Sequence, residues 1–243
     1  MCGGAALRVT AGALWDGKQL VQQPIPYGAN PRLVLAWLNT QAVRTRSPII
    51  PVGDSATEFL RMLGKETTGG RNGTLTSFKK QIQALAACHM TLGFNAAGRA
   101  YTYNGQPVRQ FEAWIQPRDS QQRPLWPGTV TFSDDYFQSL MDHAVPQDVR
   151  AMYALKGSAL AMDIYAMLAE RLHRISGRPV TLHWKSLREQ FGQEYRGAEA
   201  DKDFKKAFLP ALKKVLAVYP KAKVEQVTGG LLLFPSPPPI PYK

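Results

Sequence analysis

Two clusters of basic and amide side chains are the residues of this sequence best suited to bind a ligand. Each lies on a segment whose apolar residues recur at helical spacing, as Leu75, Phe78 and Ile82 do in the first. A two-sided helix of this kind buries one face and presents the other, where cations and amides donate hydrogen bonds to phosphates and base edges. The first cluster consists of Arg71, Asn72, Thr74, Thr76, Ser77, Lys79, Lys80 and Gln83. The second consists of Lys202, Lys205, Lys206, Lys213 and Lys214 on the helical segment, with Lys185 and Arg196 before it.

The start of the first helix offers a further reason to expect phosphate binding. Arg71, Asn72 and Thr74 lie at or before its first turn, where free amide groups and the helix dipole favour an anion. A simpler interpretation of any single lysine is a solvated helix face whose aliphatic stem covers the core. For each lysine taken alone, both interpretations stay open.

Basic residues also accompany the β-hairpin that we predict after each basic helix. Arg99 lies in the first hairpin, and Lys221 and Lys223 lie beside the second. These side chains could reach the backbone or minor groove of a bound duplex. Edge strands also use lysine merely to prevent aggregation, so the hairpin contacts have a structural alternative.

Other kinds of site find little support in the sequence. The glycine-rich run 69–74 opens a helix but lacks the Gly-Lys-Ser/Thr ending of a P-loop, so we expect it to hold a DNA phosphate rather than ATP. The two cysteines and four histidines show no metal-ligand spacing, and no Ser/His/Asp or Cys/His set is visible. Asp134 and Asp135 follow Ser133, a position where acidic residues favour a helix start. We therefore expect no metal, no cofactor and no enzymatic activity.

The composition favours a polyanionic partner. The 243 residues include 30 Lys and Arg against 18 Asp and Glu, which gives a net charge of +12. Each phosphate that a cation neutralises releases condensed counterions, and this gain does not depend on base sequence. No apolar run reaches the ~18 residues of a transmembrane helix, and the first ten residues do not resemble a secretion signal. We expect a cytoplasmic protein without membrane contact.

The predicted order of elements occurs twice, which divides the chain into two domains. In each half a helix, a short strand and a second helix precede the basic helix, and a hairpin follows it. The tail is too rich in proline for a helix or an inner strand, so we expect an extended terminal arm. The predicted parts are an N-terminal arm or irregular segment (1–24), a first domain (25–143), a second domain (144–234) and a proline-rich C-terminal tail (235–243).

Local signals set several of the predicted helix ends. Asn30-Pro31 starts the first helix, Asp54 or Ser55 caps the second, and Ser158 caps the first helix of the second half. Pro210 interrupts the second basic helix and should kink or restart it, unless residues 201–208 form a separate turn.

Strand signals follow the first basic helix. They cover residues 90–94, 99–103 and 108–115, with a turn at Asn104-Gly105, and 129–132 after a proline-rich loop at 117–127. Helix, strand, helix, basic helix and hairpin is the winged-helix arrangement, in which the third helix enters the major groove. We therefore predict an α+β protein of two tandem winged-helix domains, each a helical core with a β-hairpin wing.

Blocks of residues in both halves resemble the plasmid-encoded RepA replication-initiator family, in order and over about residues 25–242. In the first half they are Tyr27-Gly28, Pro31-Arg32-Leu33, Thr40, Ala42, Arg44-Thr45, Ser47-Pro48, Phe59, Leu63-Gly64 and Gly69-Gly70-Arg71-x-Gly73-Thr74. In the second half they are Leu155-x-Gly157-Ser158, Asp163-Ile164-Tyr165, Pro179-x-Thr181, Trp184, Leu187, Gln190-Phe191-Gly192 and Phe204-Lys205. The resemblance implies a bacterial plasmid protein that binds repeats at a replication origin, helps to melt the adjacent duplex and recruits host helicase or initiator proteins. It also implies a possible homodimer.

The leading hypothesis from the sequence is a replication initiator that binds double-stranded DNA sequence-specifically. The first alternative is a winged-helix transcriptional repressor or autorepressor that has no initiator activity. A nucleic-acid-processing enzyme is a third hypothesis, but it needs a carboxylate cluster for Mg²⁺ that the sequence does not provide.

Overall fold

The computed structural model describes residues 5–16, 18–53, 55–66, 68, 73–96, 99–111 and 128–241. The chain divides into two compact units, unit 1 (Met1–Ala144) and unit 2 (Val145–Lys243). Each contains helices and strands, so the predicted α+β class is confirmed. The predicted loop 117–127 lies outside the described residues.

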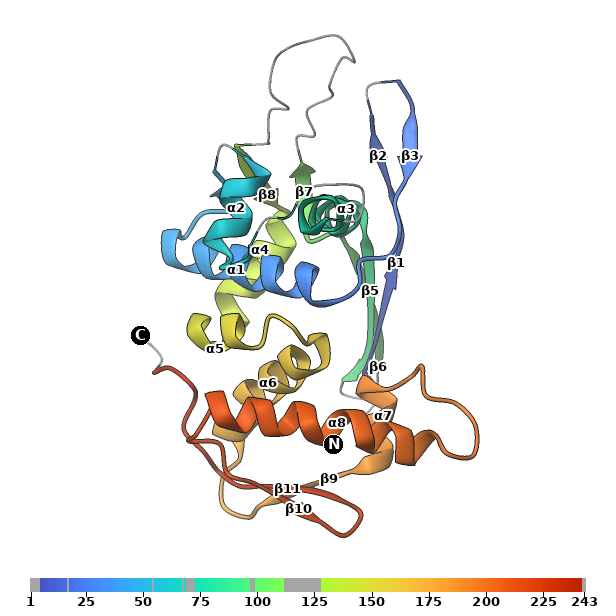
Figure 1. Ribbon diagram of the computed structural model, residues 1–243, viewed down its shortest axis with the longest axis vertical. Coiled ribbons are helices and arrows are strands. Elements are labelled where there is room, and N and C mark those ends of the chain that lie inside the picture. The colour runs from blue at the N-terminus through green and yellow to red at the C-terminus, as the bar shows by residue number, and fades with distance from the viewer. Residues whose placement is uncertain are drawn as a thin grey trace. The chain divides into compact units, whose positions relative to one another are not determined.

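Unit 1 combines helices with short strands (Figure 1). Its described helices are α1 (Ala29–Thr45), α2 (Ala56–Met62), α3 (Thr74–Ala87) and α4 (Asp134–His143). Its described strands are β1 (Ala5–Thr10), β2 (Ala13–Trp15), β3 (Leu20–Gln22), β4 (Ile49–Pro51), β5 (His89–Ala96), β6 (Arg99–Gly105), β7 (Val108–Phe111) and β8 (Thr129–Phe132).

The helices of unit 1 begin where local chemistry predicts and meet through aromatic side chains. The Ser55 hydroxyl accepts a hydrogen bond from the Glu58 amide at 3.1 Å, which confirms Ser55 as the cap of α2. Asp54, the other candidate cap, lies outside the described residues. The ring of Phe59 in α2 contacts Trp37 of α1 and Phe78 of α3, with centroids 5.0 and 5.9 Å away. These contacts hold α1, α2 and α3 in one core.

The strand pairing of unit 1 places the predicted hairpin beside β1. The hairpin that we predicted directly after α3 consists of β5 and β6, which form a sheet with β1 in the order β1-β5-β6. The short strand β4 pairs instead with β8, in the order β4-β8-β7. The predicted turn at Asn104-Gly105 is wrong, because both residues belong to β6 and pair with Thr91 and Met90.

The described part of the N-terminal segment forms strands rather than an irregular arm. Strand β1 pairs along its length with β5, and β2 pairs with β3 (Figure 1). Gly12, between β1 and β2, lies against the end of α3, where a Cβ atom would stand 2.0 Å from the Ala87 carbonyl oxygen. Only glycine permits this close approach.

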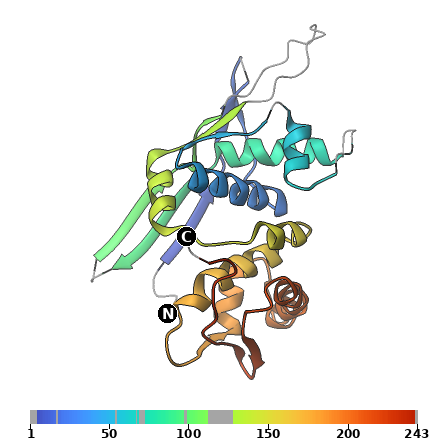
Figure 2. The ribbon, with the colours of Figure 1, turned by 90° about the vertical axis from the view of Figure 1, so that its left-hand side faces the viewer.

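Unit 2 has the element order helix, strand, helix, helix and hairpin, preceded by one short helix (Figures 1 and 2). The short helix, α5 (Val149–Ala154), was not predicted. The following helical elements are α6 (Ala159–Arg171), the 3₁₀ turn η1 (Leu172–Arg174), α7 (Trp184–Phe191) and α8 (Ala200–Val218). The strands β9 (Val180–His183), β10 (Val224–Val227) and β11 (Gly230–Leu233) form one antiparallel sheet in the order β10-β11-β9.

Of the two local signals predicted in unit 2, the Ser158 cap is confirmed, whereas Pro210 does not end the basic helix. The Ser158 hydroxyl accepts a hydrogen bond from the Ala161 amide at 3.3 Å, as predicted for the cap of α6. Pro210 does not divide the basic helix, because α8 continues from Ala200 to Val218. Proline removes the hydrogen bond to the Lys206 carbonyl, but Pro210 is exposed, so water can solvate that carbonyl. The buried face of α8 compensates for the lost bond.

The proline-rich tail packs onto unit 2, which corrects the prediction of an extended arm. Residues 235–241 have no helix or strand, as expected. However, Ser236 is buried, its amide donates to the Leu172 carbonyl at 3.2 Å, and its hydroxyl accepts from the Lys223 amide at 3.0 Å. The Tyr219 hydroxyl donates to the Pro237 carbonyl at 2.7 Å.

Two buried tyrosines predict alkaline sensitivity of unit 2. Burial raises the pKa of Tyr165 and of Tyr219 to about 12, and their rings lie 5.9 Å apart. Because the unfolded pKa is about 10, the stabilising effect is complete below about pH 10 and is lost as the pH rises towards 12. We expect the free energy of unfolding, measured with urea at each pH, to fall in this window. Combined Tyr165→Phe and Tyr219→Phe substitutions should flatten that fall, and an unchanged pH profile would refute the explanation.

Candidate nucleic-acid interface

Helix α8 separates its apolar and basic residues onto opposite sides. Phe204, Phe208 and Val215 are fully buried. An α-helix turns about 100° per residue, so Lys202, Lys206 and Lys213 fall within an arc of about 40° on the opposite side. All three are exposed. We call Lys202, Lys206 and Lys213 the α8 lysine stripe.

Two lysines of the stripe already have carboxylate partners. The Lys202 Nζ lies 2.6 Å from Glu199 Oε2, and the Lys206 Nζ lies 3.3 Å from Asp203 Oδ1. The side chains of these pairs are between 53% and 67% exposed, so water and salt screen both pairs. Lys213 has no carboxylate partner within the part of unit 2 that the structure describes. It is the member of the stripe that a phosphate can reach without competition.

Lys205 lies at the edge of the stripe and is held by α7. Its Nζ stands 5.2 Å from the ring centroid of Trp184, a cation–π contact, and the residue is half-buried. Trp184 itself packs edge-on against Phe208 at 5.8 Å. An open cavity of about 660 Å³ lies beside Lys202, Lys205 and Lys206. Its lining residues are Ala198, Asp201, Lys202, Lys205, Lys206, Leu209 and Pro210.

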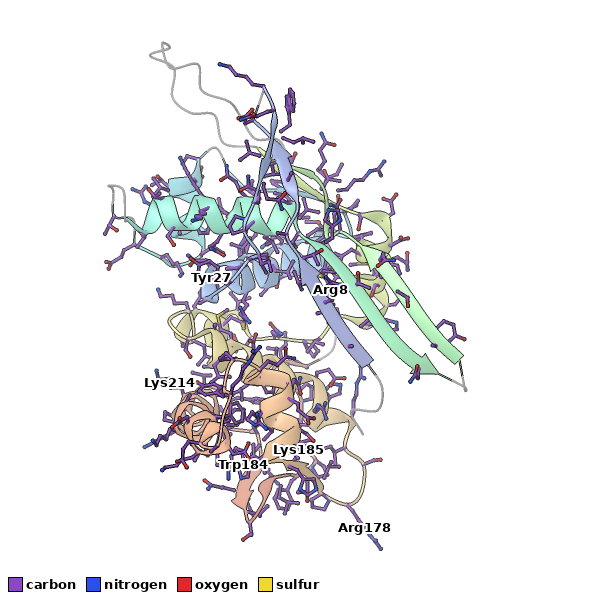
Figure 3. All side chains as sticks on the ribbon, turned by 90° about the vertical axis from the view of Figure 1, so that its right-hand side faces the viewer. Arg8, Tyr27, Arg178, Trp184, Lys185 and Lys214 are labelled. Carbon is purple, nitrogen blue, oxygen red and sulfur yellow. The ribbon has the colours of Figure 1, made fainter. Side chains whose placement is uncertain are left out.

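The remaining predicted residues of unit 2 are exposed but lie off the stripe. Lys214 falls about 100° around the helix from Lys213. Lys185 is the second residue of α7, next to Trp184 (Figure 3). Arg196 lies in the loop between α7 and α8. Lys221 and Lys223 are exposed beside β10, and the Lys223 amide fastens the tail through Ser236.

In unit 1, the exposed polar residues of α3 precede its last turn. Thr76, Lys80 and Gln83 are exposed and share an arc of about 60°. Ser77 is exposed on a neighbouring side, and Lys79 is half-buried. The last turn of α3, from Ala84 to Ala87, is buried throughout. A bound duplex could therefore reach α3 only between Thr74 and Gln83.

Thr74 has a structural role in fastening the loop before α3. Its hydroxyl accepts a hydrogen bond from the Thr68 amide at 2.8 Å and donates one to the Glu66 carbonyl at 3.1 Å. Arg71 and Asn72 lie outside the described residues. Arg99 begins β6, and its side chain lies outside the description.

Acidic residues around α8 are the part of this surface that sequence reasoning missed. Glu199, Asp201 and Asp203 each pair with a basic side chain. The spacing of three residues between Glu199 and Lys202, and between Asp203 and Lys206, would have indicated two of these pairs. The Arg188–Asp201 pair joins two helices, so no local spacing predicts it.

Two features are absent from the residues that the structure describes. No group of three His, Cys, Asp or Glu side chains that could hold a metal ion occurs among them. None of the helices described is long and apolar enough to cross a membrane.

Comparison with known families identifies the family of the chain. The model of the family described as "Plasmid encoded RepA protein" matches residues 25–185. The chain therefore belongs to the plasmid-encoded RepA family, and the family gives it the role of a replication initiator. This confirms the resemblance that the sequence blocks indicated.

Solved structures of another protein are similar to this chain in fold. Two crystal structures of domains 2 and 3 of RctB superpose on this chain with TM-scores of 0.56 and 0.52, both at 11% sequence identity. The first covers 95% of this chain and 92% of its own, and the second covers 93% and 89%. At this identity the likeness concerns the fold alone. No curated protein sequence matches the chain.

Proposed function

We propose that the chain initiates plasmid replication by binding repeated double-stranded sequences at the origin, through α8 in unit 2 and α3 in unit 1. In this proposal it has no enzymatic activity of its own and acts in the bacterial cytoplasm. Binding would promote opening of the adjacent duplex and recruitment of host helicase or initiator proteins. A homodimer would be a further state of the chain.

The winged-helix interpretation of both units supports this proposal. In unit 2, α6, β9, α7 and α8 precede the hairpin β10–β11, which pairs back onto β9. In unit 1, α1, β4, α2 and α3 precede β7 and β8, and β8 pairs back onto β4. On this interpretation β7–β8 is the wing of unit 1, and β5–β6 is an insertion between the third helix and the wing. Winged-helix proteins place the third helix in the major groove.

The observation that carries the proposal is the α8 lysine stripe opposite a buried aromatic face. Phe204 and Phe208 fix the rotation of α8 about its axis because both are fully buried. The stripe is consequently presented to solvent, where cations bind phosphates and set the register on the duplex. Lysine stems that only covered the core would be buried rather than exposed.

We expect Lys213→Ala to reduce the salt dependence of duplex binding. Each lost phosphate contact should lower the slope of log affinity against log salt by roughly one and the affinity by roughly tenfold. The measurement is a titration of a fluorescent duplex, chosen from a random pool with the full chain, at several salt concentrations. Adding Lys206→Ala should lower the slope further.

Arg174→Ala is the control for net charge. Arg174 ends η1, directly after α6, which contacts the buried side of α8. An equal effect of Arg174→Ala and Lys213→Ala would show that net charge acts rather than the stripe. The initiator role is tested separately, by supplying the chain in trans to a plasmid that lacks its own initiator gene. Replication is the expected result, whereas binding without replication would favour the repressor alternative.

A further inference from the structure

Glu199 and Asp203 are placed where they compete with DNA for the lysines of α8. They pair with Lys202 and Lys206, two of the three members of the α8 lysine stripe. A phosphate that approaches either lysine must displace its carboxylate or accept a neighbouring negative charge. The first half of the stripe is therefore largely neutralised in the free protein, whereas Lys213 is not.

Asp201, the third acidic residue of this segment, has a different position. Its Oδ1 lies 2.5 Å from the Nε of Arg188, whose side chain is only 30% exposed. Arg188 also donates to the Tyr195 carbonyl at 3.4 Å, so the pair connects α7, the following loop and α8. Asp201 is thus a structural link between helices, while Glu199 and Asp203 pair only with exposed lysines of their own segment.

The pairs should weaken binding to every duplex through its phosphate contacts. These contacts supply nearly all of the binding to unrelated DNA and are also made at the correct site, which adds hydrogen bonds to base edges. Carboxylates near the phosphates reduce this shared contribution and leave the base contacts largely intact, so both affinities should fall by a similar factor. They also reduce counterion release, because each carboxylate that loses its lysine attracts a cation from solution.

We propose, on the basis of the proposed function, that Glu199 and Asp203 act as an electrostatic brake that lowers the affinity of α8 for DNA and the salt dependence of its binding. The two residues set the strength of binding and need not touch a base. A purely structural role is the alternative, because acidic residues in the first turn also stabilise a helix through its dipole.

The test combines Glu199→Gln with Asp203→Asn in the full chain. We expect affinity for a mixed-sequence duplex to rise roughly tenfold, with a salt slope steeper by roughly one to two. Affinity for the duplex selected from a random pool should rise by a similar factor, because both duplexes share the phosphate contacts. Hydrogen exchange of the α8 amides, measured in parallel, reports the structural alternative, which predicts faster exchange with an unchanged slope.

Glu170→Gln is the matched control. Glu170 pairs with Arg174 at 2.7 Å, so this variant removes one acidic charge, against two in the double variant, and releases one cation, but on α6. It should leave the slope and both affinities unchanged. An equal response per removed charge in Glu170→Gln would overturn the brake in favour of net charge.

Lys213→Ala separates failure of the brake from failure of the proposed function. If Lys213→Ala weakens binding while the double variant binds as the unmodified chain does, the α8 interface stands and the brake is wrong. If Lys213→Ala has no effect, or the chain shows no salt-dependent binding to any duplex, both the interface and the brake are overturned.

Discussion

Phe208→Ala should lower the free energy of unfolding of unit 2 by about 3–5 kcal/mol, the range for removing a buried phenylalanine ring. Phe208 is fully buried, and its ring centroid lies 5.2 Å from that of Phe204, 5.8 Å from Trp184 and 6.1 Å from Phe191. The substitution removes the centre of this cluster and leaves a cavity between α7 and α8. Because a domain of this size is stable by only about 5–15 kcal/mol, we expect a large loss of duplex binding as well.

The hydrogen-exchange rates of the α8 amides, measured in the full chain, report this loss of stability in unit 2. Leu209→Ala is the control, since Leu209 is the next residue of the same helix but lies beside the exposed lysines. It should change exchange in α8 by far less than Phe208→Ala. Comparable exchange in the two variants would show that the aromatic cluster does not hold α8.

Gly230→Ala should destabilise unit 2 by about 3 kcal/mol, at the upper end of the range for overpacking. Gly230 begins β11 opposite His183 of β9. A Cβ atom there would stand 2.1 Å from the Leu182 carbonyl oxygen and 2.8 Å from its carbon. Both atoms belong to the backbone, so no side-chain rotation can relieve the clash and β9 must separate from β11. The hairpin would then lose its attachment to the rest of the unit.

Gly157→Ala is the control for replacing a glycine where no clash arises. Nothing lies within 4 Å of a Cβ atom at Gly157, and its backbone is not left-handed. This substitution should be neutral or slightly stabilising, because it reduces the freedom of the unfolded chain. Urea unfolding of both variants distinguishes them, and similar midpoints for Gly230→Ala and the unmodified chain would contradict the clash.

Long-range strand pairing and ion pairing between helices were beyond the reach of sequence patterns. The residues of β5 and β6 were correctly predicted as strands, but β1, which pairs with β5, lies about 80 residues earlier in the chain. The alternation of apolar and polar side chains shows that a strand has a buried face, but it does not show which strand pairs with it. The same limit applies to Arg188 and Asp201, which come together only because α7 packs against α8.

The sequence by itself determined most of the helices, the caps Ser55 and Ser158 and the side of α8 that carries lysine, because hydrophobic period and capping act between residues at most four positions apart. It also indicated the family, through short blocks of residues that occur in the family's order. Only the tertiary structure decided that β8, not β6, joins β4, and that Tyr219 and Ser236 hold the tail against unit 2. It likewise decided that α8 continues past Pro210. These outcomes depend on burial summed over distant segments, which outweighs the local cost of a proline or the local preference for a nearby hairpin.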